Sequence, residues 1–144
     1  MENIIFLDID GVLNGIEFQK SFDKEPPIID ETRLAILKEI IDRSGANVVL
    51  SSSWKKFWKP NCTFDIVFKK SCIDIYDITP ALGRKRDEIS AWLVAHPNTE
   101  SYVILDDAQV GWGDLLPFLV ITDPLNSRGL EYEHIEKALK ILNN

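Results

Sequence analysis

The sequence opens with the stretch Met1-Glu-Asn-Ile-Ile-Phe-Leu-Asp-Ile-Asp-Gly-Val-Leu-Asn14, around which the rest of the chain is organised. Its continuous apolar run, Ile4 to Leu7, predicts a strand that is buried on both faces of a parallel sheet. Asp8 and Asp10 follow directly, and because side chains alternate along a strand, both carboxylates face the same way. Their charges repel each other unless a cation or a shared proton compensates them. The stretch therefore predicts a functional site at the end of a core strand.

Further along the chain, segments with the pattern of buried strands alternate with segments of helical periodicity. Strands are expected over Ile4–Leu7, Asn47–Ser53, Ile73–Ile78, Tyr102–Leu105 and Leu119–Thr122. Helices are expected from a cap at Asp30 to about Ser44, over Phe64–Ser71, over Lys85–Ala95 and over Leu130–Leu142, with a further helical turn from Trp54 and a loop over Gly15–Ile29. This alternation predicts a doubly wound, Rossmann-like α/β fold of three layers with a parallel sheet of about five strands.

Length and composition indicate one domain that spans residues 1–144. The chain is 45% hydrophobic and 27% charged, which is ordinary for a globular protein. No apolar run approaches the roughly 20 residues of a membrane span, and a secretory signal is not evident, so we expect a cytoplasmic protein without a membrane partner. Cys62 and Cys72 are then expected to be reduced thiols.

The charge is unevenly distributed along the chain. The net charge is −7, which argues against strong nonspecific binding of nucleic acid by the whole surface. The segment from Lys55 to Arg86, however, carries +5, so the remainder carries −12. This segment is either a solvated basic face or an electropositive rim that attracts an anionic substrate.

Chemically active side chains follow three of the predicted strands: Asp8 and Asp10, then Ser51 to Ser53, then Asp106 and Asp107. In doubly wound sheets, ligands bind beyond the carboxyl ends of the strands. A set of carboxylates without a histidine or cysteine cluster favours Mg²⁺. Phosphoryl transfer fits this set, because one carboxylate can attack phosphorus, a second can carry the proton, and a hydroxyl and a cation can hold the phosphate.

The motifs resemble, in the same order, those of the haloacid dehalogenase (HAD)-like superfamily. Asp8-Ile-Asp-Gly-Val-Leu13 is similar to its DxDGxL signature, and Val48-Val-Leu-Ser-Ser52 is similar to its second motif, an apolar strand that ends in Ser or Thr. The basic run Arg84-Lys-Arg86 is similar to the third motif, and Val103-Ile-Leu-Asp-Asp107 to the fourth. The serine-serine-tryptophan and Leu-Asp-Asp details resemble a subgroup of short HAD-like domains, some of which are found in RNA-repair proteins.

The resemblance implies a role for each carboxylate. Asp8 would be the nucleophile and a metal ligand. Asp10 would be the general acid and base, with its backbone carbonyl on the metal. Asp106 and Asp107 would complete the Mg²⁺ site.

Two assignments stay open at this point. The hydroxyl that binds phosphate is either Ser51 or Ser52, and alternation along the preceding strand favours Ser52. The catalytic and phosphate-binding cation is Arg84, Lys85 or Arg86. Lys85 is favoured because it opens the predicted helix.

The gaps between the motifs are too short for a full cap domain of the kind that many HAD-like enzymes carry. A site with little or no cap is open to a bulky substrate, such as a nucleotide, a nucleic-acid end or a phosphoprotein. The predicted function is therefore a Mg²⁺-dependent phosphatase that hydrolyses a phosphomonoester through an aspartyl-phosphate. A metal-dependent nuclease of the DxD type and a catalytically silent module that binds Mg²⁺ and phosphate are the alternatives, and the oligomeric state stays open.

Overall fold

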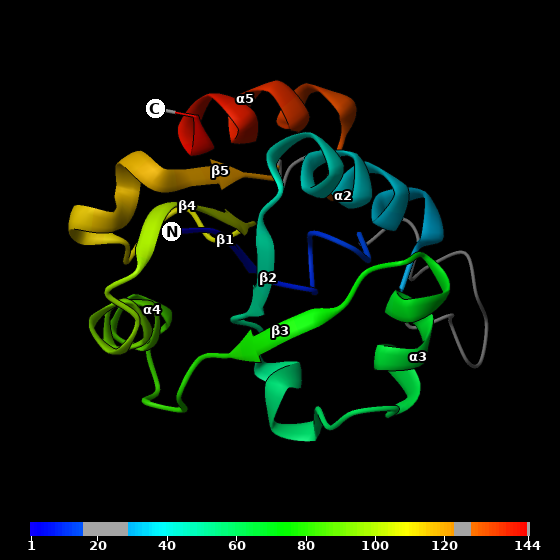
Figure 1. Ribbon diagram of the computed structural model, residues 1–144, viewed down its shortest axis with the longest axis horizontal. Coiled ribbons are helices and arrows are strands. Elements are labelled where there is room, and N and C mark those ends of the chain that lie inside the picture. The colour runs from blue at the N-terminus through cyan, green and yellow to red at the C-terminus, as the bar shows by residue number, and fades with distance from the viewer. Residues whose placement is uncertain (16–28, 123–127, 144) are drawn as a thin grey trace.

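The computed structural model describes residues 1–15, 29–122 and 128–143. Its strands are β1 (Glu2–Leu7), β2 (Asn47–Leu50), β3 (Ile75–Ile78), β4 (Thr99–Asp106) and β5 (Leu119–Ile121). They form one sheet of parallel strands in the order β3-β2-β1-β4-β5, so that β1 lies at the centre (Figure 1). The predicted α/β fold with a parallel sheet of about five strands is confirmed.

Helices cover both faces of the sheet. The helical elements are α2 (Glu31–Ser44), η1 (Ser53–Phe57), α3 (Thr63–Lys70), α4 (Lys85–Ala95), η2 (Gly113–Phe118) and α5 (Tyr132–Leu142), of which η1 and η2 are 3₁₀ helices. One core contains side chains of α2, α3 and α5 together with Ile5 and Leu7 of β1. The other core contains side chains of α4 and η2 together with Ile4 and Phe6 of the same strand. The continuous apolar run of β1 is explained by this burial on both faces.

The ends of several elements follow from local chemistry. Asp30 caps α2, accepting a hydrogen bond from the Thr32 N–H at 2.9 Å, and Gly45 ends the helix with a φ of 71°. β4 begins at Thr99 rather than at the expected Tyr102, because Thr99 pairs with Glu2 at the start of β1. None of the described helices is long and apolar enough to cross a bilayer. The predicted loop 15–29 lies, for residues 16–28, outside the described part of the chain.

The strand order brings three strand ends together at the switch point of the sheet. Leu7 pairs with both Leu50 and Leu105, the last apolar residues of β1, β2 and β4. The next residues continue this pattern, because Ser51 N–H donates to Leu7 O at 2.9 Å and Asp8 N–H donates to Leu105 O at 3.0 Å. The side chains that follow these strands therefore share one edge of the sheet.

Candidate active site

Three carboxylates converge at this edge. Asp8, Asp106 and Asp107 each offer an oxygen atom, and these three atoms lie within 4.8 Å of one another. Asp8 and Asp106 are buried, with 5% and 0% exposure, and Asp107 is half-buried. Hard oxygen donors of this kind suit Mg²⁺. The cluster could therefore hold a metal ion.

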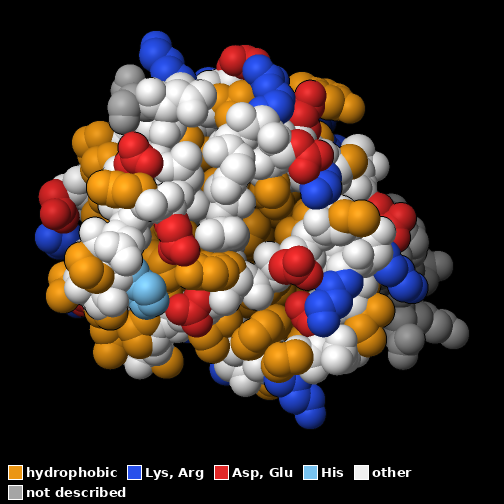
Figure 2. Space-filling view, in the orientation of Figure 1, with side chains coloured by type: hydrophobic (Ala, Val, Ile, Leu, Met, Phe, Trp, Pro, Cys, Tyr) orange, Lys and Arg blue, Asp and Glu red, His pale blue; other side chains and the backbone are white. Residues whose placement is uncertain are grey.

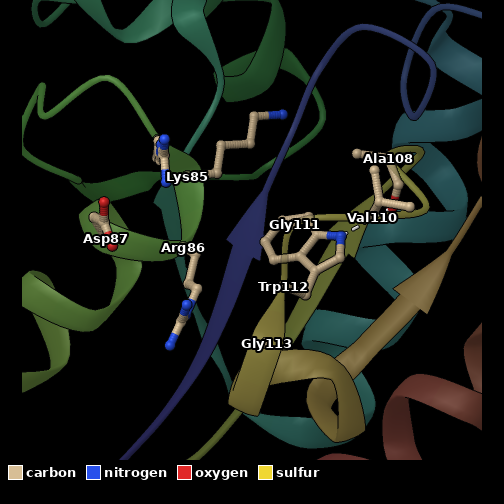
Figure 3. Close-up of a pocket in the computed structure, with 9 residues that line it drawn as sticks. Lys85, Arg86, Asp87, Ala108, Val110, Gly111, Trp112 and Gly113 are labelled. Carbon is tan, nitrogen blue, oxygen red and sulfur yellow. Dashed lines mark hydrogen bonds between the residues drawn. The ribbon is translucent and has the colours of Figure 1, made fainter.

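Lys85, the first residue of α4, reaches into the carboxylate cluster. Its Nζ atom lies 2.9 Å from Asp8 Oδ2 and 2.7 Å from Asp106 Oδ2. Arg86 instead pairs with Asp114, and Arg84 is exposed in front of the helix. Figure 3 shows Lys85 extending toward the end of β1 while Arg86 points away from it. Of the three adjacent cations, the structure brings Lys85 to the carboxylates.

The cluster carries more negative charge than Lys85 neutralises. Burial and the neighbouring Asp106 charge raise the pKa of Asp8 to about 6, against the smaller opposing effect of Lys85. Burial and Asp106 also raise the pKa of Asp107. Burial alone would lower the pKa of Lys85, but the charges of Asp8 and Asp106 outweigh it, so the pKa of Lys85 is raised and the ammonium stays protonated. A divalent cation fits this site because it would supply the missing positive charge.

Asp10 lies at the same edge, but its side chain is exposed and is not part of the three-carboxylate cluster. Its Oδ1 accepts a hydrogen bond from Asn14 Nδ2 at 3.2 Å, and its Oδ2 accepts one from Trp54 Nε1 at 3.1 Å. Neither donor was predicted from the sequence. Trp54 also packs edge-on against Phe64. The Asp10 carboxylate is thus in contact with solvent and is held in one direction by two donors. Both properties suit a group that carries a proton.

Gly11 lets the chain turn tightly against the cluster. Its φ of +80° lies in the left-handed region, and a Cβ atom there would lie only 2.1 Å from Asp107 Oδ2. The Thr122 hydroxyl, at the end of β5, donates to Gly11 O at 2.8 Å and anchors the turn. The close approach of Gly11 to Asp107 was not expected from the sequence.

The two candidate serines have different environments. Ser52 Oγ accepts a hydrogen bond from the Trp54 N–H at 3.1 Å and so caps η1. Ser51 Oγ is buried, and within the described part of the chain it has no hydrogen-bond partner. Alternation favoured Ser52 because it assumed that the strand continues, but β2 ends at Leu50. Both hydroxyls keep an O–H that can donate to a phosphate oxygen, but of the two serines only Ser51 lines a hollow beside Lys85.

Two hollows flank Lys85. One, of about 330 Å³, is lined by Ser51, Ser53, Lys55, Lys56, Ala81, Gly83, Lys85 and Glu88. The other, of about 480 Å³, is lined by Arg84, Lys85, Arg86, Asp87, Ala108, Val110, Gly111, Trp112 and Gly113 (Figure 3). Trp112 borders the second hollow and is fixed there by a hydrogen bond from its Nε1 to Ala108 O at 2.9 Å. Each hollow is lined by basic side chains, one acidic side chain and small or apolar residues, and Lys85 borders both.

The basic segment from Lys55 to Arg86 does not form one continuous surface. Lys55 is buried against Glu88, whereas Lys56 and Arg84 are exposed beside the two hollows. On the face drawn in Figure 2, basic side chains are interspersed with acidic ones. Only part of the segment can therefore act as an electropositive rim.

A family model described as "HAD domain in Swiss Army Knife RNA repair proteins" matches residues 4–135 of the chain. The match includes every residue of the carboxylate cluster, the serines and Lys85. No curated protein and no solved structure gives a match.

Proposed function

Because the chain belongs to the family of HAD domains found in Swiss Army Knife RNA repair proteins, we propose that it is a Mg²⁺-dependent phosphatase that removes a terminal phosphate from RNA. The family indicates a HAD-type hydrolase. One observation carries the finer proposal: a buried Asp8 is bridged to Asp106 by the Lys85 ammonium, with Asp107 beside them.

The side chains divide the chemistry of phosphomonoester hydrolysis between two displacement steps. An Asp8 carboxylate oxygen attacks phosphorus, the bond to the leaving oxygen breaks, and Asp10, acting as the general acid, gives that oxygen a proton. In the second step a water oxygen attacks the phosphorus of the aspartyl-phosphate, and Asp10 accepts the water proton. Inorganic phosphate leaves and Asp8 is restored.

Two further groups stabilise the phosphate during these steps. The Lys85 ammonium lies beside Asp8 Oδ2, where it offsets the charge that the phosphoryl group brings. The Ser51 hydroxyl, which is buried and unpaired within the described residues, donates to a phosphate oxygen.

Asp8, Asp106 and Asp107 would hold Mg²⁺, together with the backbone carbonyl of Asp10. When bound, Mg²⁺ supplies positive charge that lets an anionic carboxylate approach an anionic ester. The fit rests on the donor set itself, because the cluster is made of carboxylate oxygens, and burial together with the charge of Asp106 raises the pKa of Asp8. An Asp10 side chain held apart by Asn14 and Trp54 keeps its proton-carrying role separate from metal binding.

An RNA end is the substrate favoured by the surroundings of Lys85. The two hollows place exposed cations, Lys56 and Arg84, on either side of it, where they can meet neighbouring phosphodiesters. The exposed apolar side chains Leu82 and Val110 lie on the loops beside the same site and can contact bases or ribose. The described chain between Ser51 and Lys85 consists of η1, α3, β3 and short connections, so this side of the site stays open to a polymer.

The test is release of inorganic phosphate from RNA oligonucleotides that carry a single 5′- or 3′-terminal phosphate, with Mg²⁺ and with a chelator. We expect Mg²⁺-dependent release by the parent protein and loss of release by Asp8→Asn. The matched control is Asp42→Asn, which removes an exposed carboxylate of α2 and should leave the activity unchanged.

Other outcomes would contradict the proposal. Equal activity of Asp8→Asn and the parent would remove Asp8 as the nucleophile. Cleavage at internal phosphodiesters without phosphate release would identify a metal-dependent nuclease. Binding of Mg²⁺ without turnover of any phosphate ester would identify a catalytically silent module.

A further inference from the structure

A buried ion pair lies beside the candidate site and is not used by the proposed chemistry. Lys55, in η1, and Glu88, in the first turn of α4, are 8% and 6% exposed, and Lys55 Nζ lies 2.7 Å from Glu88 Oε1. Both residues line the smaller hollow together with Ser51 and Lys85. A buried ion pair of this kind is weak evidence for stability, because desolvation offsets the attraction. Its position therefore calls for another explanation.

Lys55 has no hydrogen left for a substrate. An ammonium group has three donors, and Lys55 Nζ lies within hydrogen-bond distance of three acceptors. These are Glu88 Oε1 at 2.7 Å, Thr79 Oγ1 at 3.0 Å and Pro80 O at 3.3 Å. Lys55 is thus committed to the protein, although it lies in the basic segment that the sequence offered as a substrate-binding rim.

Glu88 uses its second oxygen to hold the loop that enters α4. Its Oε2 accepts hydrogen bonds from the backbone N–H groups of Leu82 at 2.8 Å and Gly83 at 3.3 Å. Lys85 follows this loop after one further residue. Lys85 and Glu88 are also three residues apart on one helix, so that they share a face of its first turn.

From these contacts we propose that Lys55 and Glu88 are positioning residues that hold Lys85 between Asp8 and Asp106. They do so by clamping the loop from Thr79 to Gly83 against η1, and the proposal rests on the proposed function of Lys85. The clamp also connects the two flanks of the phosphate site. Lys55 lies in η1, which directly follows Ser51 and Ser52, so its ion pair with Glu88 joins the element next to the serines to the helix that carries Lys85.

The experiment compares three variants of the full chain. Lys55→Met leaves Glu88 buried without its partner, so we expect it to lower both the melting temperature and kcat. The double variant Lys55→Met/Glu88→Met replaces the pair by apolar side chains of similar length, which restores stability in other buried ion pairs. Lys69→Met is the control, because it removes an ion pair of the buried Asp65 in α3, away from Lys85.

For the double variant we expect a melting temperature near that of the parent, but kcat on an aryl phosphate about tenfold lower or more, with KM little changed. We also expect faster amide exchange at Leu82 and Gly83, and a changed ¹⁵Nζ resonance of Lys85. Lys69→Met should lower the melting temperature while kcat and the Lys85 resonance stay as in the parent.

A double variant with parental stability and parental kcat would overturn the proposal, since Lys85 would then be held in place without the pair. Unchanged exchange at Leu82 and Gly83 would overturn it as well. If the parent hydrolyses no phosphate ester, the proposed function fails, and the ¹⁵Nζ resonance of Lys85 alone then tests the positioning role of the pair. A shifted resonance in the double variant would support that role, and an unchanged resonance would overturn it.

Discussion

Asp8 is the residue at which burial and charge oppose its ionisation most directly. Burial and the charge of Asp106 raise its pKa to about 6, although Lys85 touches its Oδ2 atom. A nucleophilic carboxylate must be ionised, so the site holds this group in its reactive form above pH 6 at a cost in folding stability. Perturbed carboxylates of this kind are characteristic of functional sites.

This cost leads to a prediction for Asp8→Asn in the absence of metal. Between pH 4 and 6 the folded parent binds more protons at Asp8 than the unfolded chain, so its stability falls as the pH rises through that window. The amide has no charge to bury. At pH 8 with a chelator, Asp8→Asn should therefore be more stable than the parent by up to about 3 kcal/mol, and this advantage should shrink toward pH 4.

The measurement is urea unfolding at a series of pH values. Asp42→Asn, in which the lost carboxylate is exposed, should show no such pH-dependent gain. Added Mg²⁺ at pH 8 should stabilise the parent more than Asp8→Asn, which would reverse or reduce the difference. A parent that is more stable than Asp8→Asn at pH 8 without metal would contradict the prediction.

Gly11 provides a second prediction, and the chain offers a matched control for it. Alanine at Gly11 would have a φ of +80° and a Cβ atom 2.1 Å from Asp107 Oδ2. Alanine at Gly45 would have a similar φ of +71° with nothing within 4 Å. Both changes should cost about 1–2 kcal/mol of folding stability through the backbone. Only Gly11→Ala should also displace Asp107 and weaken Mg²⁺ binding, which calorimetric titration would measure; equal Mg²⁺ affinity of the two variants would show that Asp107 is not a ligand.

At the scale of whole elements, the sequence predicted the helices and strands that depend on local sequence signals. The helix Lys85–Ala95 has the predicted bounds, because its apolar face is periodic and Pro97 follows its end. The central strand and its two aspartates could be placed because a run buried on both faces is distinctive. The 3₁₀ helix η2 was not predicted, since six residues that include Gly113 and Pro117 carry no helical period.

What the sequence could not show are contacts between elements that are distant along the chain. Lys55 and Glu88 are 33 residues apart, and nothing in either local sequence indicates their pairing. Trp54 and Asp10 meet across 44 residues in the same way. For the serines the difference is local: a strand was expected through Ser53, but β2 ends at Leu50 and the chain turns into η1, so the alternation that favoured Ser52 does not extend to the serines.

The capping of η1 leads to a prediction that separates the two serines. Ser52→Ala removes the N-cap of η1 and should lower folding stability by about 1 kcal/mol. Ser51→Ala removes a buried hydroxyl without a partner among the described residues, so stability should stay the same or rise, whereas kcat/KM for phosphate hydrolysis should fall about 100-fold. Denaturant unfolding and steady-state kinetics of both variants check this. A larger kinetic loss in Ser52→Ala than in Ser51→Ala, at equal folded fraction, would restore Ser52 as the phosphate ligand.

At the scale of the molecule, the fold brings a few basic side chains of an acidic protein together at one place. The chain carries a net −7, yet the switch point of the sheet gathers Lys85 and, around it, Lys56 of η1 and Arg84 at the N-cap of α4. Much of the remaining basic segment is already neutralised, as in the pairs Lys55–Glu88 and Arg86–Asp114. An RNA end would therefore meet a few cations within a surface that repels the rest of the polymer.

This distribution predicts a shallow dependence of RNA hydrolysis on salt. Each phosphate contact of a single strand contributes a slope of about −0.7 to the logarithmic dependence of affinity on salt concentration. With Lys56 and Arg84 as the exposed contacts, the slope for KM of a phosphorylated oligonucleotide should be about 1.4 in magnitude, and Arg84→Ala should reduce it by about half. An aryl phosphate, which has no neighbouring phosphodiesters, should show almost no slope. Steady-state kinetics between 50 and 200 mM salt would test this. A steep slope of the size that six or more phosphate contacts produce would mean that RNA binds a surface other than the two hollows beside Lys85.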